Sequence, residues 1–271
     1  MSDGRLPLTI PVQPWFRDHC FGGRVILPAV ETMLLLAARA ASLYPSVDIK
    51  VMEEVRFAKF LEIPQDLASV NCLVECWQPG DGRLGLKLLS RIQGRMMSRI
   101  KEHGEVYFSW PNPAKKQAIS LEPGKPQGAV REITADYIYR HLVPFGPSYR
   151  TLKDKLFLSK DTAWGILEAP QLQMEPVRQL LGSPFPLDGA LHAACVLGRQ
   201  SVDFVPFPVG FAKRVVIRPT RPGCRYLTKV RRLNGGADEL IFDLIIFDRD
   251  DRLYESISGL RMRDVSGAIA R

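Results

Sequence analysis

The chain has 271 residues, of which 46% are hydrophobic, and a formal net charge of +8 at pH 7. This length supports one large domain or two small ones with a real core. No basic start followed by an apolar run marks a signal peptide, and no apolar stretch reaches the ~20 residues that a membrane span requires. We therefore expect a soluble, cytoplasmic protein, either a discrete polypeptide or a domain of a larger protein.

The excess of positive charge favours an acidic partner. The lysines and arginines are nevertheless spread through strand-like segments, so solvated strand faces are the alternative explanation. No basic helix or aromatic-basic ribbon typical of nucleic-acid binding occurs. The five cysteines are scattered, and no cysteine pair lies at zinc-ligand spacing from the four histidines. We expect reduced cysteines, no metal and no bound cofactor.

The first predicted helix runs from Pro28 to about Ser42 and is apolar nearly all the way round. Such a helix must be buried on most sides. Four β-rich runs at hairpin spacing follow it, at 53–64, 69–78, 83–92 and 101–110. We expect residues 1–112 to fold as an antiparallel sheet curled around this helix.

Residues 113–130 are rich in Pro, Lys and Gly and are expected to form a linker. A second apolar helix is predicted from about Pro184 to Gln200, followed by β-rich runs at 209–220, 224–233, 239–248 and 252–263. The segments "RFAKFLEIP" (56–64) and "GFAKRVVIRP" (210–219) are alike, which indicates a duplication. The expected fold class is therefore α+β, with a second helix-wrapped sheet over 131–271.

The candidate chemical groups lie at the starts of the two buried helices. His19 precedes the first helix, Asp188 is expected in the first turn of the second, and His192 follows on the same helix face. Facing one cleft, a histidine and a carboxylic acid would suit removal of a proton α to a carbonyl and protonation of a β-hydroxyl. Each residue alone also has a structural explanation: a loop histidine, an aspartate favoured by the helix dipole, and a core histidine.

Three motifs, in this order, resemble those of polyketide synthase dehydratase domains. "HCFGGRVILP" (19–28) fits HxxxGxxxxP, "FGPSYR" (145–150) resembles YGPxF, and "LDGALH" (187–192) resembles DxxxQ/H. The lead-in "PWFRDH" and the closing strands are also similar to the family. The resemblance implies a double hot-dog fold in which two halves share one active site. The chain departs from the family at Phe145, where the motif has a tyrosine.

The resemblance implies that His19 is the catalytic base and that Asp188 is the acid. We expect His192 to be neutral and to orient Asp188 by a hydrogen bond, and the amide of Gly23 to bind the thioester carbonyl. The implied substrate-binding positions are Gly23, Pro28, Phe145, Gly146, Pro147 and His192. The implied substrate is a 3-hydroxyacyl thioester on the phosphopantetheine arm of an acyl carrier protein, which loses water to give a 2-enoyl thioester.

The resemblance also implies other synthase components as partners and a homodimer as the assembly, in polyketide or fatty-acid type synthesis. Two other functions fit the same sequence. One is a product-template-like cyclase or enoyl isomerase acting on the same kind of thioester. The other is a binding module for acyl carrier protein without turnover, which the replacement of the motif tyrosine by Phe145 keeps open.

Overall fold

The computed structural model describes residues 4–93, 98–112, 119–125, 128, 130–172, 176–233 and 239–265. The elements of the first half are β1 (Gly4–Pro11), η1 (Pro14–Asp18), β2 (Cys20–Phe21), β3 (Arg24–Val25), α1 (Ala29–Leu43), β4 (Asp48–Phe57), β5 (Ser69–Trp77), β6 (Arg83–Gln93) and β7 (Ser98–Ser109). Those of the second half are β8 (Arg131–Thr134), α2 (Ala135–Tyr137), η3 (Ile138–Leu142), η4 (Pro147–Tyr149), β9 (Leu152–Leu158), β10 (Thr162–Glu168), α3 (Pro176–Leu181), α4 (Pro184–Gly198), β11 (Phe207–Val216), β12 (Arg225–Leu233), β13 (Leu240–Phe247) and β14 (Leu253–Arg263).

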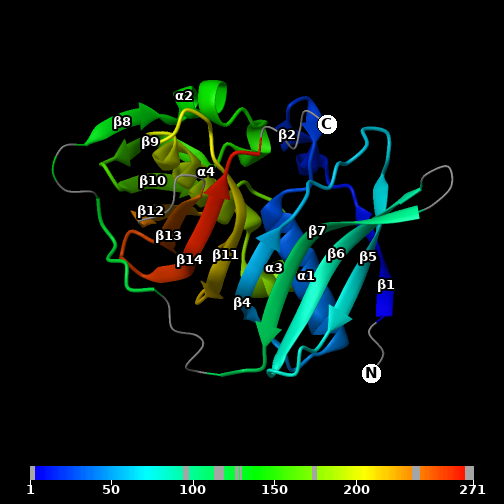
Figure 1. Ribbon diagram of the computed structural model, residues 1–271. Helices are drawn as coiled ribbons and strands as arrows, with labels where there is room; N and C mark the ends of the chain where they lie inside the picture. The colour runs from blue at the N-terminus through cyan, green and yellow to red at the C-terminus, as the bar shows by residue number, and fades with distance from the viewer. Residues whose placement is uncertain are drawn as a thin grey trace.

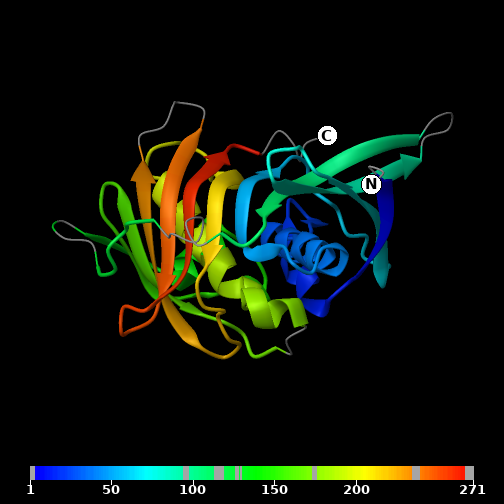
Figure 2. The ribbon, with the colours of Figure 1, turned by 90° about the horizontal axis from the view of Figure 1, so that it is seen from below.

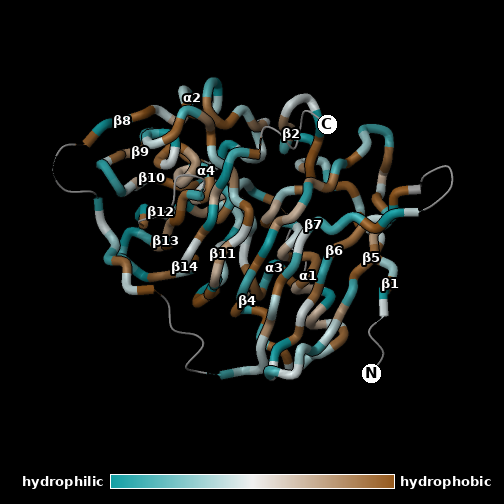
Figure 3. Tube along the Cα trace, viewed as in Figure 1, coloured by the Kyte–Doolittle hydropathy of each residue, from teal (hydrophilic) through white to brown (hydrophobic). Residues whose placement is uncertain are grey.

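One antiparallel sheet runs through both halves, with β2 and β3 forming a separate small hairpin. Its strand order is β1-β5-β6-β7-β4-β11-β14-β13-β12-β10-β9-β8. The first five strands belong to the N-terminal half and the other seven to the C-terminal half, which lie side by side in Figure 1. Hydrophobic and polar residues alternate along many of these strands, as expected for strands with one buried face (Figure 3).

The two halves join where β4 pairs with β11, and these strands carry the two similar sequence segments. Arg56 and Gly210, the equivalent positions of the two segments, are paired with each other in the ladder. The pairing of equivalent positions indicates a pseudo-twofold axis between the two halves, at the β4–β11 pair. Gly210 has a φ of +151°, and a Cβ there would lie 2.2 Å from the carbonyl oxygen of Val55, so the close approach of the strands requires glycine.

Each half wraps its sheet around a buried helix (Figure 2). Helix α1 packs against β4, β6 and β7, helix α4 packs against β9, β10, β12 and β13, and the two helices contact each other. Every residue of α4 is buried, and one hydrophobic core extends through both halves. Pro28 is the N-cap of α1 and Pro184 begins α4, where a missing N–H has no intrahelical partner to lose. The predicted α+β architecture of two helix-wrapped sheets is confirmed.

Several strands lie outside the segments that the sequence predicted. Strand β4 begins at Asp48, earlier than the expected start at residue 53, and the strands β1, β8, β9 and β10 were not anticipated. Strand β1 contains Pro7 and Pro11, which weaken a strand pattern, but it lies at the edge of the sheet, where a missing N–H is tolerated.

Much of the expected linker, at 113–118, 126–127 and 129, lies outside the described residues. The described part at 119–125 lies against the C-terminal sheet. Leu121 packs in a small hydrophobic cluster with Trp164, Ile245 and Phe247, and Lys229 Nζ donates to the carbonyl of Glu122 at 2.8 Å. This part of the connection therefore contributes to the core of the second half.

Candidate active site

His19 lies in the turn that follows η1, and its ring is oriented by the backbone. Its N–H donates to the carbonyl of Phe16 and its own carbonyl accepts from the N–H of Ile26, both at 3.0 Å. The ring Nδ1 lies 2.9 Å from the carbonyl oxygen of Ile26. Because a carbonyl can only accept, Nδ1 carries the proton of the neutral ring. The lone pair of Nε2 is then the group available as a base.

The motif at 145–150 holds this turn from the second half of the chain. Gly146 N–H donates to the carbonyl of Asp18 at 2.7 Å, and the N–H and O–H of Ser148 both donate to Asp18 Oδ2, at 2.9 and 2.5 Å. A Cβ on Gly146 would lie 2.4 Å from Asp18 Oδ1, so the close approach requires glycine. We call Asp18, Gly146 and Ser148 the Asp18 clamp. It fixes the residue directly before His19.

Phe145 forms a wall between the two candidate histidines. Its ring stacks on His19, with centroids 4.2 Å apart and planes 22° apart, and its centroid lies 5.2 Å from that of His192. Tyr149 meets the His19 ring edge-on at 5.1 Å. Burial lowers the pKa of His19 below its ordinary value of 6.5, although the nearby Asp188 carboxylate acts in the opposite direction. The surroundings therefore favour the neutral ring that a base requires.

Asp188 lies in the second turn of α4, not in the first turn as the sequence suggested. The helix begins at Pro184 and has no acidic residue in its first turn. The helix dipole, which acts mainly within the first turn, therefore favours the carboxylate less than expected. The Asp188 side chain is buried, and its Oδ2 has no hydrogen-bond partner among the described residues.

His192 faces Asp188 from the next turn of α4. His192 Nε2 lies 3.0 Å from Asp188 Oδ2, but the two atoms are not aligned as a hydrogen bond, so the expected bond is present as a close contact only. The other ring nitrogen, Nδ1, lies 3.3 Å from the hydroxyl of Tyr139. The Tyr139 hydroxyl in turn accepts from the N–H of Leu152 at 2.9 Å. A buried chain of polar groups thus extends from Asp188 to η3 and β9.

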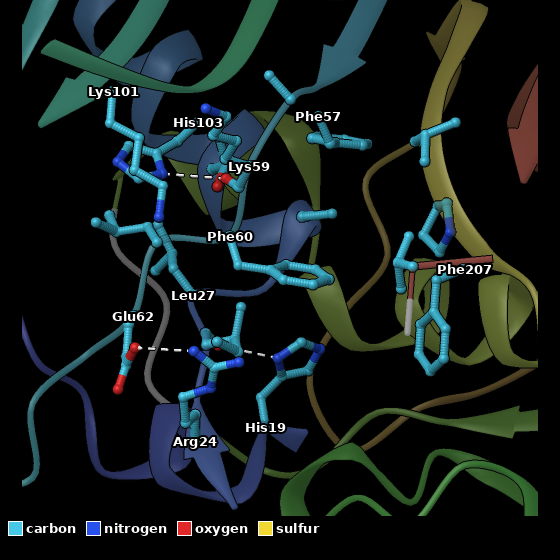
Figure 4. Close-up of a pocket in the computed structure, with 18 of the residues that line it drawn as sticks. His19, Arg24, Leu27, Phe57, Lys59, Phe60, Glu62, Lys101, His103 and Phe207 are labelled. Carbon is cyan, nitrogen blue, oxygen red and sulfur yellow. Dashed lines mark hydrogen bonds and ion pairs between the residues drawn. The ribbon is translucent and has the colours of Figure 1, made fainter. Parts of the chain in front are cut away.

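His19 and Asp188 line one cavity of about 680 Å³, together with Phe145 and His192. Its other walls come from both halves: Leu27 and Ala29 at the start of α1, Leu191 and Cys195 of α4, and Phe207 of β11. Figure 4 shows His19 and His103 on opposite sides of the Phe60 ring. The fold therefore brings His19 and Asp188, which are 169 positions apart in the chain, to one site, as the sequence suggested.

Four cations also line this cavity: Arg24, Lys59, Arg99 and Lys101. The Arg24 guanidinium lies 3.8 Å from a carboxylate oxygen of Glu62. Within the ranges that the structure describes, the other three form no ion pair. These four cations outnumber Glu62, the one surface carboxylate in the lining. The cavity therefore attracts anionic groups.

The other expected binding positions lie beside the cavity rather than in its lining. Gly23 is exposed at the tip of the β2–β3 hairpin, where its φ of +76° suits glycine. Pro28 caps α1, Gly146 belongs to the Asp18 clamp, and Pro147 begins η4.

Sequence reasoning missed Asp18, Ser148, Tyr139 and the cations of the cavity. Asp18 was visible as part of the quoted lead-in to His19, and its position beside the base was a usable signal. Tyr139 gave no such signal, because its partner His192 is 53 positions away and the intervening strands were not predicted.

An imidazole on one half and a carboxyl group on the other, lining one cavity, suit proton removal and proton delivery at adjacent carbons. The family profile described as polyketide synthase dehydratase N-terminal domain matches residues 111–271, more than half of the chain. The chain belongs to this family. It is a dehydratase, a hydro-lyase of the polyketide synthase type. The matched region contains Asp188, His192 and the 145–150 motif, whereas His19 precedes it.

Solved structures of polyketide synthase dehydratases share the double hot-dog fold of this dehydratase. An N-terminal dehydratase from the difficidin assembly line has a TM-score of 0.74 and 15% identity, covering 98% of this chain and 94% of that one. The dehydratase domain of RzxB from Pseudomonas fluorescens has a TM-score of 0.68 and 16% identity, covering 89% and 87%. A bifunctional dehydratase-cyclase domain in ambruticin biosynthesis has a TM-score of 0.69 and 18% identity, covering 95% and 90%. Among curated protein sequences, none matches the chain significantly.

Two further features of the dehydratase concern metals and membranes. In the described part of the chain, no group of three or more His, Cys, Asp or Glu side chains converges as metal ligands would. The helices described are all too short or too polar to cross a bilayer.

Proposed function

We propose that the chain eliminates water from a 3-hydroxyacyl thioester on the phosphopantetheine arm of an acyl carrier protein. His19 Nε2 takes the α proton, the electron pair forms the α–β double bond, and the hydroxyl leaves the β carbon with a proton from Asp188. The products are a 2-enoyl thioester and water. The observation that carries the proposal is that His19 and Asp188, from opposite halves of the chain, line one cavity.

The surroundings of His19 support its role as the base. Its Nδ1–H is held by the carbonyl of Ile26, and burial lowers its pKa, so the neutral form with a free Nε2 is favoured. Stacking on Phe145 restrains rotation of the ring. A base fixed in this way loses little orientational freedom when the substrate binds, which is a main source of rate enhancement.

The start of α1 is the better candidate for binding the thioester carbonyl. We expected this role for the Gly23 amide, but Gly23 lies at an exposed hairpin tip outside the cavity lining. Ala29, the first residue of α1, does line the cavity. The first N–H groups of a helix have no intrahelical acceptor and stabilise negative charge, as on the enolate oxygen that forms when the α proton leaves.

We also propose that each half, 1–112 and 131–271, is a hot-dog subdomain that contributes one catalytic group. The pairing of equivalent positions Arg56 and Gly210 at the seam supports a division of this kind. The connection between the subdomains extends over 113–130, and its described part packs on the second subdomain.

The activity is tested with the purified chain and 3-hydroxyacyl thioesters of several lengths, on carrier protein and as short soluble analogues. We expect a loss of 18 mass units and the absorbance of an enoyl thioester. Isomerisation would leave the mass unchanged, and cyclisation with loss of water would be recognised by NMR of the product. If the wild-type chain dehydrates no substrate of any length while still binding carrier protein, the binding-module function replaces this proposal.

The cations of the cavity support the carrier-protein partner, because phosphopantetheine contains a phosphate and carrier proteins are acidic. The double variant Lys59→Glu, Lys101→Glu should raise KM for the carrier-bound substrate on the order of tenfold and leave KM for a short soluble thioester within about twofold. Lys160→Glu, in the exposed β9–β10 turn, is the matched control and should change neither. Equal effects on both substrates would remove the argument for a carrier protein.

A further inference from the structure

A buried chain of three side chains links the acid to the backbone of the second half. It runs from Asp188 Oδ2 to His192 Nε2 at 3.0 Å, and from His192 Nδ1 to Tyr139 Oη at 3.3 Å. It ends at the N–H of Leu152, which donates to Tyr139 Oη at 2.9 Å. All three side chains are buried. Dehydration requires the proton of Asp188 to lie on the carboxyl oxygen that reaches the substrate. Tyr139, near the far end of this chain of hydrogen-bonding groups, bears on which oxygen carries that proton.

The Tyr139 hydroxyl has one proton to donate and already accepts one hydrogen bond from Leu152. Donation to the lone pair of His192 Nδ1 therefore satisfies both groups. A neutral imidazole that accepts at Nδ1 carries its proton on Nε2. Nε2–H is then the proton next to Asp188 Oδ2, which lies 3.0 Å away and has no other partner among the described residues.

The tautomer of His192 decides which oxygen of Asp188 holds the acidic proton. Asp188 lines the cavity while its Oδ2 is fully buried, so Oδ1 is the oxygen that can reach a substrate. When Oδ2 accepts from Nε2–H, the proton of the carboxylic acid is left on Oδ1. With the opposite tautomer, the bare Nε2 would draw that proton to Oδ2, away from the cavity.

We propose that Tyr139 is a positioning residue that keeps the proton of His192 on Nε2 and thereby directs the acidic proton of Asp188 into the cavity. This inference rests on the proposed function of Asp188 as the acid. Tyr139 itself does not touch the substrate, since it is absent from the lining of the cavity in the described chain.

Thr151 also acts on the Tyr139 hydroxyl, in the direction of a donor to its oxygen, which leaves the Tyr139 proton for His192. Three further groups near this chain leave the tautomer to Tyr139. His19, which lies on the other half of the chain and lines the same cavity, donates its one ring proton to the carbonyl of Ile26. Phe145 covers the His192 ring and offers no proton. Cys195 lies one turn further along α4, and burial raises the pKa of its thiol, which stays neutral. Burial also raises the pKa of Tyr139, so its hydroxyl keeps the proton that it donates.

The tautomer can be measured without any turnover. Nitrogen NMR of the four histidine side chains in the wild-type chain should show His192 protonated on Nε2, and His19 protonated on Nδ1. A neutral His192 protonated on Nδ1 would overturn the inference, even if dehydration is observed. Conversely, an inactive chain with the expected tautomer would contradict the proposed function and leave the assignment of Tyr139 intact.

Kinetics then test the consequence. Tyr139→Phe should lower kcat on the order of tenfold with KM within about twofold, because one hydrogen bond to the acid's partner is lost. The matched control is Tyr226→Phe, which removes another buried hydroxyl that accepts a backbone N–H, from Arg221 at 2.7 Å, outside the cavity lining. Its kcat should be that of the wild type. An unchanged kcat in Tyr139→Phe would overturn the inference.

A double-mutant cycle separates positioning from simple packing. Glutamine at position 192 places an amide N–H near the site of Nε2–H and needs no tautomer to donate to Asp188. The His192→Gln variant should therefore retain turnover. Adding Tyr139→Phe to this variant should lower its kcat by less than twofold. If His192→Gln is inactive, or if Tyr139→Phe costs as much in this background as in the wild type, Tyr139 does not act through the tautomer of His192.

Discussion

The proposed base, His19, and the proposed acid, Asp188, are held in place by different means. His19 lies in a turn, and its position depends on hydrogen bonds to Ile26 and on the Asp18 clamp from the second half. Asp188 lies in α4, whose residues are all buried, so the packing of a whole helix fixes its backbone. The base side therefore depends on a few named hydrogen bonds, whereas the acid side depends on the core and on one orienting neighbour.

This difference predicts which mutations displace His19 and which displace Asp188. A residue held by a few bonds is displaced by removing any one of them, with little loss elsewhere in the fold. A residue on a buried helix is displaced only by changes that also destabilise the protein, because packed cores do not yield locally. Mutations near His19 should therefore lower activity with little loss of stability, whereas mutations near Asp188 should lower both.

The largest expected effect is the loss of either proton-transfer group. His19→Ala and Asp188→Asn should each lower kcat by about 10²–10⁴-fold, the usual contribution of a general acid or base. The comparison of the two sides predicts that His19→Ala leaves the unfolding transition close to that of the wild type, since His19 lies in the turn after η1 and not in a packed helix. Turnover and denaturant unfolding of both variants check this. A variant that keeps wild-type kcat would remove its residue from the mechanism.

The next effect is expected from opening the Asp18 clamp. Asp18→Ala removes the acceptor of two hydrogen bonds from Ser148 and should lower kcat on the order of tenfold, because His19 is then held less firmly. Asp161→Ala is the matched control, since Asp161 accepts from hydroxyl groups in the exposed β9–β10 turn. If both variants lose activity equally, the clamp has no special relation to the base.

A smaller effect concerns pH. Burial lowers the pKa of His19 below 6.5, so the neutral base persists as the pH falls past the ordinary histidine value. The acidic limb of the profile of kcat/KM, which reports groups of the free enzyme, should therefore have its midpoint below pH 6.5. A midpoint at or above 6.5 would show that the Asp188 carboxylate outweighs burial at the base. Rates over pH 4.5–8 with one short soluble thioester measure it.

The smallest effect is expected at Gly23. Its φ of +76° suits glycine, and a Cβ there would meet no atom within 4 Å. Gly23→Ala should therefore lower the free energy of unfolding by about 1 kcal/mol through backbone strain alone. Because its amide lies outside the cavity lining, kcat should change less than about threefold. A large loss of kcat at unchanged stability would instead indicate that the Gly23 amide binds the thioester carbonyl.

Much of the fold was predictable because the signal was local. The all-round apolar segments beginning at Pro28 and Pro184 became α1 and α4 almost at their predicted bounds, and the alternating runs after each became strands. The likeness of 56–64 and 210–219 indicated the duplication. Strands β1 and β8 were missed at the two edges of the sheet, and β10 pairs with the distant strand β12. Strand β9 pairs with its chain neighbours β8 and β10 and was missed as well.

The two buried helices and the duplicated plan could be predicted from the sequence, because each depends on residue types at short spacing, and the family motifs singled out His19 and Asp188 as the candidate base and acid. Only the tertiary structure decided that His19 and Asp188 line one cavity, that Asp18 receives Ser148, and that Tyr139 meets His192. These contacts join segments far apart in the chain. Such contacts form only when the two sheets pair at the β4–β11 seam and close around their helices, and no local pattern encodes that packing.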